Sequence, residues 1–372
     1  MRVTQPAVLV GAYDWDEKLI PRAEYDARIN QVFAKLSDGG LAGLVVYGNK
    51  VDNAALAYLT NFAPKIESGM ALVTKDGKVR IHGAGSPHMM VNAKRLTWTE
   101  DVRPLRDPAK NISEWADEVG AKGPLGFWTC EAMPTDLLPR AQAGLGERKL
   151  VDVSDKLNAL LREKSPVALR LVREACGMLG KAATVLEEWF HGASAREAAI
   201  AAEKAATQAG AQDVRVLISL GKGGTPTAID YPESGKHDPL LAYIAVRHAG
   251  YWAEGFLTLA SMPNDTLTRT QAALKAMLAK AKAGTGVAEL RDVAQSALGK
   301  LAIHPAARKA AVGVGLALEE TEAAPGGVAK LEAGRVYSLR AGAQVSLSDN
   351  ALLSAMIVPK ADGVDILWSA LG

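Results

Sequence analysis

Two charged residues stand inside apolar segments of the C-terminal half that have the composition of β-strands. Glu254 lies in the segment 251–260, and Arg340 lies in the segment 336–341. A carboxylate can bind a metal ion or act as a general base, and a guanidinium can hold a carboxylate through paired hydrogen bonds. Isolated charged residues are usually solvated. The two residues therefore become a candidate site only if the fold directs both into one cavity.

Other segments resemble catalytic or ligand-binding motifs in composition but do not match them. The run 221–225 (GKGGT) has the composition of a phosphate-binding loop, but it lacks the Walker spacing and does not open a helix. No Gly-x-Ser-x-Gly segment occurs. The two cysteines, Cys130 and Cys176, are too few for a disulfide framework or a thiolate metal site. The sequence therefore indicates neither nucleotide binding nor a serine or cysteine nucleophile.

The composition indicates a globular protein with a large core. Of 372 residues, 48% are hydrophobic and 23% are charged, and 43 basic against 41 acidic residues give a formal net charge of +2. Without long runs of one sign, nucleic acid and membrane surfaces are not expected partners. Residues 1–12 are too short and too soon interrupted for a signal peptide, and no stretch reaches the ~18–20 apolar residues of a spanning helix. We expect a cytoplasmic protein with reduced cysteines.

Residues 1–158 are predicted to form the smaller of two domains, with an α/β arrangement. Apolar residues at helical spacing predict a helix over 22–36, and 41–47 (LAGLVVY) is a run typical of a buried strand. The other predicted elements are a hairpin over 71–82, a helix at 111–118, and strands at 124–127 and 151–153. Strands that alternate with helices indicate a mixed or mostly parallel sheet covered by helices.

Residues 159–372 are predicted to form an α+β domain. Ser165 and Pro166 suit the N-cap and first position of a long helix that runs to Phe190. Further helices are predicted at 195–208, 267–281 and 287–301, and strands at 214–220, 240–246, 251–260, 310–318, 336–341, 351–358 and 364–369. Helices gathered against an antiparallel sheet give this fold class.

Five stretches, in order and over nearly the whole chain, resemble the creatinase/aminopeptidase P/prolidase superfamily. Residues 53–62 (NAALAYLTNF) resemble its Asn…Tyr-Leu-Thr-x-Phe segment, and 161–165 (LREKS) its Leu-Arg-x-Lys-Ser entry to the catalytic domain. Residues 238–258, 312–320 (VGVGLALEE) and 331–342 (LEAGRVYSLRAG) resemble the three stretches that carry the family's metal ligands. The resemblance implies a C-terminal pita-bread domain preceded by a creatinase-type N-terminal domain.

The same resemblance implies that the metal ligands have been replaced. Family peptidases hold two metal ions with two Asp, one His and two Glu, and these positions fall on Tyr243, Glu254, Val312, Arg340 and, on or near it, Ser354. Only Glu254 keeps a metal-binding side chain, because valine has no lone pair and arginine adds a permanent positive charge. We therefore expect no metal and no cofactor. An ion pair between Arg340 and Glu254 is expected in the place of the metal ions.

Further site candidates come from the resemblance. The family histidine that contacts substrate falls on Glu319, and the acidic residue after it is retained as Glu320. Glu254, Glu319, Glu320 and Asp230 are candidate catalytic carboxylates, because burial raises a carboxyl pKa toward the useful range. Candidate substrate-binding residues are Arg340, Tyr243, His248 and Tyr231, although His248 on its own suits an exposed position at a strand end.

The implied function is metal-independent hydrolysis of a C–N bond in a small non-peptide substrate, as in creatinase or ectoine hydrolase. Arg340 would anchor a carboxylate-bearing substrate or stabilise developing oxyanion charge. Two alternatives stay open: a non-catalytic pseudoenzyme that binds a peptide or a small ligand in the cavity, as metal-free pita-bread domains do in a histone chaperone subunit, and a lyase of the same fold. Relatives also imply a homodimer in which the N-terminal domain of one chain covers the partner's cavity.

Overall fold

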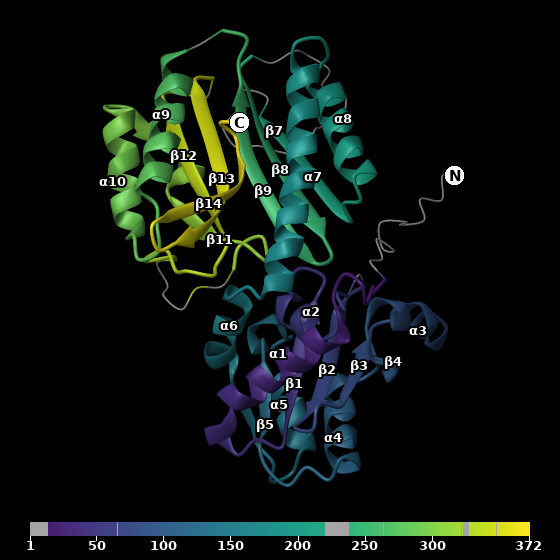
Figure 1. Ribbon diagram of the computed structural model, residues 1–372. Coiled ribbons are helices and arrows are strands. Elements are labelled where there is room, and N and C mark those ends of the chain that lie inside the picture. Colours follow the sequence, from purple (N-terminus) through teal and green to yellow (C-terminus); the bar gives the residue numbers. More distant parts are fainter. Residues whose placement is uncertain are drawn as a thin grey trace. The chain divides into compact units, whose positions relative to one another are not determined.

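The computed structural model describes residues 14–64, 66–219, 238–262, 264–320, 322, 327–346 and 348–372. The chain divides into two compact units, Met1–Leu161 and Arg162–Gly372, which follow one another along the colour bar of Figure 1. No helix among the described residues combines the length and the apolar character that crossing a membrane requires.

The first unit is a six-stranded mixed sheet covered by helices, which confirms the predicted arrangement. The strand order is β4-β3-β2-β1-β5-β6, antiparallel between β1, β2 and β3 and parallel at β3–β4, β1–β5 and β5–β6. The strands are β1 (Gly43–Asn49), β2 (Ser68–Thr74), β3 (Val79–Gly83), β4 (Val102–Pro104), β5 (Leu125–Trp128) and β6 (Leu150–Asp152). The helices are α1 (Arg22–Lys35), α2 (Ala54–Thr60), α3 (Pro87–Ala93), α4 (Pro108–Glu118), α5 (Leu137–Gly144) and α6 (Ser154–Arg162).

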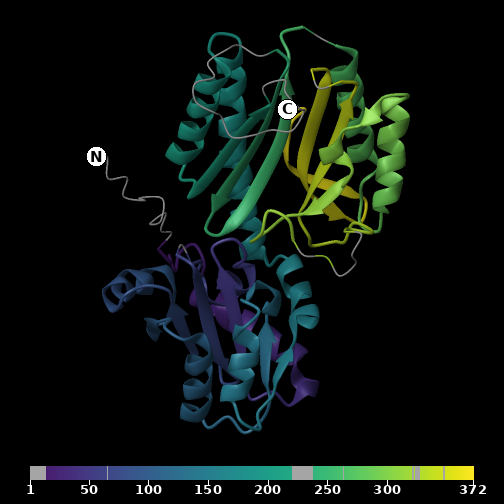
Figure 2. The same ribbon diagram turned by 180° about the vertical axis from the view of Figure 1, so that it is seen from behind.

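The second unit contains two antiparallel sheets, each backed by a pair of helices. The first sheet has the order β7-β8-β9, and the second has the order β10-β12-β13-β14 with β11 paired to β12. The strands are β7 (Asp213–Ser219), β8 (Leu240–His248), β9 (Tyr251–Leu259), β10 (Ala302–Ile303), β11 (Ala311–Gly313), β12 (Tyr337–Gln344), β13 (Asn350–Lys360) and β14 (Gly363–Ser369). Figures 1 and 2 show α7 (Pro166–Phe190) and α8 (Ala195–Gln208) over the first sheet, and α9 (Asp265–Lys280) and α10 (Val287–Leu298) over the second. The predicted α+β class is confirmed.

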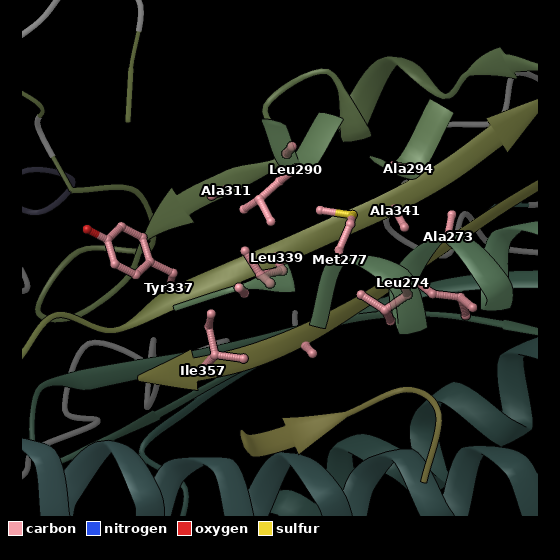
Figure 3. Close-up of a cluster of buried hydrophobic side chains, with 14 of the residues drawn as sticks. Ala273, Leu274, Met277, Leu290, Ala294, Ala311, Tyr337, Leu339, Ala341 and Ile357 are labelled. Atoms are coloured by element: carbon pink, nitrogen blue, oxygen red, sulfur yellow. The ribbon is translucent and has the colours of Figure 1, made fainter. Parts of the chain in front are cut away.

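One core joins the second sheet to α9 and α10 and fixes which strand residues face away from these helices. Figure 3 shows Leu339 and Ala341 of β12 packed toward Met277 of α9. Because side chains alternate along a strand, the intervening Ser338 and Arg340 point to the opposite face. We call this the inner face of the second sheet.

The predicted strand at 310–318 is wrong beyond its first residues. Only Ala311–Gly313 forms a strand, after which the chain turns so that Glu320 N donates to Gly313 O at 2.9 Å. A Cβ at Gly315 would lie 2.4 Å from Glu320 Oε1. The turn therefore places the Glu320 carboxylate beside Gly315, which has no side chain to occupy that space. The apolar composition of the segment predicted a continuous strand and did not indicate the turn.

The close contact of Gly255 in β9 with Trp368 in β14 gives a stability test. A Cβ at Gly255 would lie 2.5 Å from ring atoms of Trp368. Gly255→Ala should therefore lower the free energy of unfolding by about 1–3 kcal/mol, as overpacking does, measured by urea denaturation. Gly363→Ala is the matched control, because nothing lies within 4 Å of a Cβ there. Equal stability of the two variants would show that the contact is not tight.

Candidate functional site

Arg340 of β12 and Glu254 of β9 form a buried ion pair on the inner face. Arg340 Nη2 lies 2.5 Å from Glu254 Oε1, and Arg340 Nε donates to the same oxygen at 3.1 Å. The side chains are only 12% and 2% exposed. A single charge buried at this depth is costly unless it is paired, so each residue compensates the other. The predicted pairing is confirmed.

Tyr243 of β8 completes this group. Its hydroxyl donates to Glu254 Oε2 at 2.9 Å, so both carboxylate oxygens hold donors. Burial and the neighbouring Glu254 charge raise the pKa of Tyr243, which keeps the phenol protonated. The Phe256 ring packs 4.7 Å from the Tyr243 ring and 5.2 Å from Arg340 Cζ, measured to centroids. We call Tyr243, Glu254, Phe256 and Arg340 the charged cluster.

Strand register brings the cluster together. In the β8–β9 pair, Tyr243 lies opposite Phe256 and Ala245 lies opposite Glu254, so all four share one face. In the β12–β13 pair, Arg340 lies opposite Ser354. These faces of the two sheets meet at the cluster, and we use the term inner face for both.

Side chains, rather than a backbone ladder, connect β9 to β13 beside the cluster. Phe256 N donates to Ser354 Oγ at 2.8 Å. Thr258 Oγ1 donates to Leu352 O at 3.1 Å and accepts from Leu352 N at 2.9 Å. Ser354, one of the expected metal positions, therefore serves as a connection between the sheets.

These residues do not fit a dinuclear metal centre. Glu254 has donors on both oxygens, the Tyr243 phenol is protonated, and Arg340 occupies the space with a fixed positive charge. Val312 is buried and apolar, and Ser354 is bonded to the backbone. Within the described part of the chain, no group of three or more His, Cys, Asp or Glu is placed to hold a metal ion. Divalent ions of this class need several oxygen or imidazole ligands.

Glu320 belongs to a separate buried group. Lys164 Nζ lies 2.6 Å from Glu320 Oε1, with side chains 1% and 3% exposed. Arg335 Nη2 lies 3.8 Å from Glu320 Oε2 and 2.5 Å from Glu322 Oε1. Glu320 Oε2 makes no hydrogen bond with a described residue. Burial raises the pKa of Glu320 and lowers the pKa of Lys164.

The remaining predicted site residues are not brought to the cluster. Glu319 is exposed and pairs with Lys309. His248 lies on the opposite face of β8 from Tyr243, where its Nε2 is 2.9 Å from Glu174 Oε2 of α7. The structure thus places His248 away from the inner face, because its position in the strand has the other parity. Asp230 and Tyr231 lie outside the described residues.

A cavity of about 130 Å³ adjoins Val312 and Glu320. Its wall includes acidic residues and cationic side chains: Glu319, Glu320, Glu322, Arg291, Arg308 and Lys309. Val312 also faces Ser338 across the β11–β12 pair. Val312, the position expected for the metal-binding histidine, and Glu320 therefore line the same cavity.

Among the residues that sequence reasoning missed are the cations Lys164 and Arg215. Lys164 lies in the LREKS stretch, so the resemblance marked its segment but not its partner. Arg215 of β7 lies with its Cζ 4.6 Å from the Trp252 ring centroid. Alternation of side chains along β7 places Arg215 on the inner face once its pairing with Ala245 of β8 is known. The sequence alone does not give this pairing.

Comparison with known families and structures agrees with this architecture. The model of metallopeptidase family M24 matches residues 170–358, and that of the creatinase/prolidase N-terminal domain matches residues 28–163. A search of curated proteins found no match.

Solved structures with this fold include X-Pro aminopeptidase from Thermotoga maritima MSB8, with TM-score 0.77, 16% identity, and coverage of 91% of this chain and 97% of that one. The prolidase from Pyrococcus horikoshii OT3 has TM-score 0.72, 17% identity, and coverage of 92% and 97%. The Xaa-Pro dipeptidase from Bacillus anthracis has TM-score 0.72, 15% identity, and coverage of 92% and 97%. At these identities the likeness shows the fold. Together with the family match, it establishes that the chain belongs to metallopeptidase family M24 and carries a creatinase/prolidase-type N-terminal domain before its pita-bread domain.

Proposed function

We propose that this M24-family chain acts on a small carboxylate-bearing molecule without a metal ion, and that its reaction is hydrolysis of a C–N bond. The observation that carries the proposal is the Arg340–Glu254 pair at two of the positions where the resemblance places metal ligands. Arginine is permanently charged, and its planar fork suits a carboxylate. Arg340 thus supplies the positive charge that a metal ion would otherwise bring to the inner face.

The charged cluster keeps capacity for a ligand. Arg340 Nε and Nη2 hold Glu254, whereas Nη1 makes no hydrogen bond with a described residue. A carboxylate has about four lone-pair sites, so Glu254 can accept a further N–H. A ligand that presents a carboxylate to Arg340 and an amide, urea or guanidino N–H to Glu254 satisfies both. This pairing supports a substrate with a C–N bond next to an acidic end.

Hydrolysis also requires a base for water. Among the described carboxylates, Glu320 is the candidate, because burial raises its pKa and its Oε2 makes no hydrogen bond with a described residue. Since Glu320 belongs to a separate buried group with Lys164, the substrate would have to extend from the charged cluster to reach it. The water oxygen would add to the carbon, the C–N bond would break, and the proton taken by Glu320 would pass to the departing nitrogen. In this reaction Arg340 would hold the substrate carboxylate through its remaining N–H donors. Asp230 is the other candidate base.

Binding without turnover is the second candidate, and a specific observation favours it. Both oxygens of Glu254 already hold donors, and Glu319 pairs with Lys309 at the surface. Carboxylate oxygens that already hold donors are less available to a water molecule. In that case, the charged cluster would serve recognition alone.

The buried ion pair can be tested by a double-mutant cycle. Arg340→Met should lower the free energy of unfolding by about 3 kcal/mol or more, because it leaves Glu254 buried without a counter-charge. Glu254→Gln in the same chain should restore part of the loss. Arg269→Met is the control, since Arg269 and its partner Asp265 are 44% and 68% exposed, and it should cost less than about 1 kcal/mol. Additive effects of the two cluster substitutions would show that the pair is not coupled.

Elemental analysis tests metal independence. Protein purified without chelator should contain no stoichiometric Mn, Zn, Co or Fe, because Tyr243, Val312, Arg340 and Ser354 do not supply a ligand set. An M24 metallopeptidase with intact ligands, purified in parallel, controls for metal loss. A tightly held ion in every chain would overturn the assignment of these positions.

A ligand screen tests the function itself. Small carboxylates with amide, urea or guanidino groups should raise the melting temperature, by the equivalent of about 2.7 kcal/mol at a concentration 100 times the Kd. Arg340→Lys should weaken this binding and Arg269→Met should not. Amine release that Glu320→Gln abolishes while binding persists would establish hydrolysis. Binding without release supports the second candidate, and a screen without any shift rejects both.

A further inference from the structure

Arg215 lies on the inner face beside the charged cluster. In the β7–β8 pair it is opposite Ala245, which in turn is opposite Glu254 in the β8–β9 pair. Residues aligned across neighbouring strands share a face. Arg215 and Glu254 are therefore separated by one small residue, at a Cα distance of about 10 Å from two strand spacings.

An aromatic ring holds Arg215 while its hydrogen-bond donors stay available. Its Cζ lies 4.6 Å from the Trp252 ring centroid, and the ring is also contacted by Arg247 at 5.4 Å. The Arg215 side chain is 50% exposed, and its ion pair with Asp213 is long, at 3.6 Å. Its guanidinium makes no hydrogen bond with another described residue. Stacking orients a guanidinium and leaves its N–H edge for a planar anion.

Arg215 and Arg340 act on the same hydroxyl group. Both positive charges lower the pKa of Tyr243, against the larger upward effect of burial and of Glu254. Tyr243 therefore lies within electrostatic reach of both arginines. Its ring and that of Phe256 provide an apolar surface beside them.

We propose that Arg215 is a specificity-determining residue that binds a second anionic group, so that the ligand is a small dicarboxylate. One carboxylate meets Arg340 and the other meets Arg215, with the carbon chain between them against Tyr243 and Phe256. This inference rests on the proposed carboxylate site at Arg340 and narrows its ligand class.

Calorimetric titration of the full chain with matched acids tests the inference. The probes are the dicarboxylates glutarate and adipate and the monocarboxylates valerate and hexanoate. The wild type should bind the better dicarboxylate about tenfold or more tightly than its matched monocarboxylate, since a charge-assisted hydrogen bond contributes on this scale. Arg215→Gln should remove that difference and leave monocarboxylate affinity within about twofold. Arg269→Gln, at an exposed arginine of α9, should change neither affinity.

The outcomes separate this inference from the function on which it rests. Equal affinity of the wild type for both acid classes overturns the role of Arg215 while the Arg340 site stands. Equal weakening of both classes by Arg215→Gln also overturns it, because Arg215 then contributes only background charge. Failure of all four acids to bind counts against the Arg340 carboxylate site as well.

Discussion

The inner face depends on one constraint, which is that a buried carboxylate needs a positive partner. The Glu254 side chain is only 2% exposed, and water cannot stabilise its charge. Metal ions or a guanidinium can both provide the compensation, and here Arg340 does so from the opposite sheet. The Tyr243 hydroxyl donates a hydrogen bond to the remaining carboxylate oxygen, Oε2. The pair also joins β9 to β12, next to the hydrogen bonds of Ser354 and Thr258 that join β9 to β13. The contact that compensates the buried charge therefore also holds the two sheets together.

The same constraint shapes the segment after β11. Glu320 and Lys164 are both buried and lie 2.6 Å apart, which ties the entry of α7 to the turn that follows β11. Side chains at Gly313 and Gly315 would collide with this group: a Cβ would lie 2.8 Å from Arg335 Nη2 at the first position and 2.4 Å from Glu320 Oε1 at the second. The glycines of this stretch are therefore explained by the space that the charges need, without reference to metal chemistry.

Much of the fold could be predicted from sequence patterns, but only part of the candidate site could. Helical periodicity and Ser165-Pro166 predicted α7, and the resemblance predicted both domains. The helix α2 was missed because it is buried almost all round and shows no polar face. The pairing of Arg340 with Glu254 was predictable because homologous strands fix the face of each residue. The contact of Tyr243 with Glu254, the separation of Glu320 from the cluster and the outward direction of His248 depend on register and turns, which sequence spacing does not determine.

A guanidinium and a metal ion differ in the chemistry that they can perform. A metal ion accepts lone pairs and can activate a bound water, whereas a guanidinium only donates hydrogen bonds and holds charge. Proton transfer must then come from carboxylates, and the one in the cluster is already stabilised by three donor atoms. Recognition of an acidic group is therefore the step that the proposed function assigns to Arg340. Turnover needs a second carboxylate that holds fewer hydrogen-bond donors. Whether Glu320 can accept a proton from water therefore distinguishes a hydrolase from a binding protein.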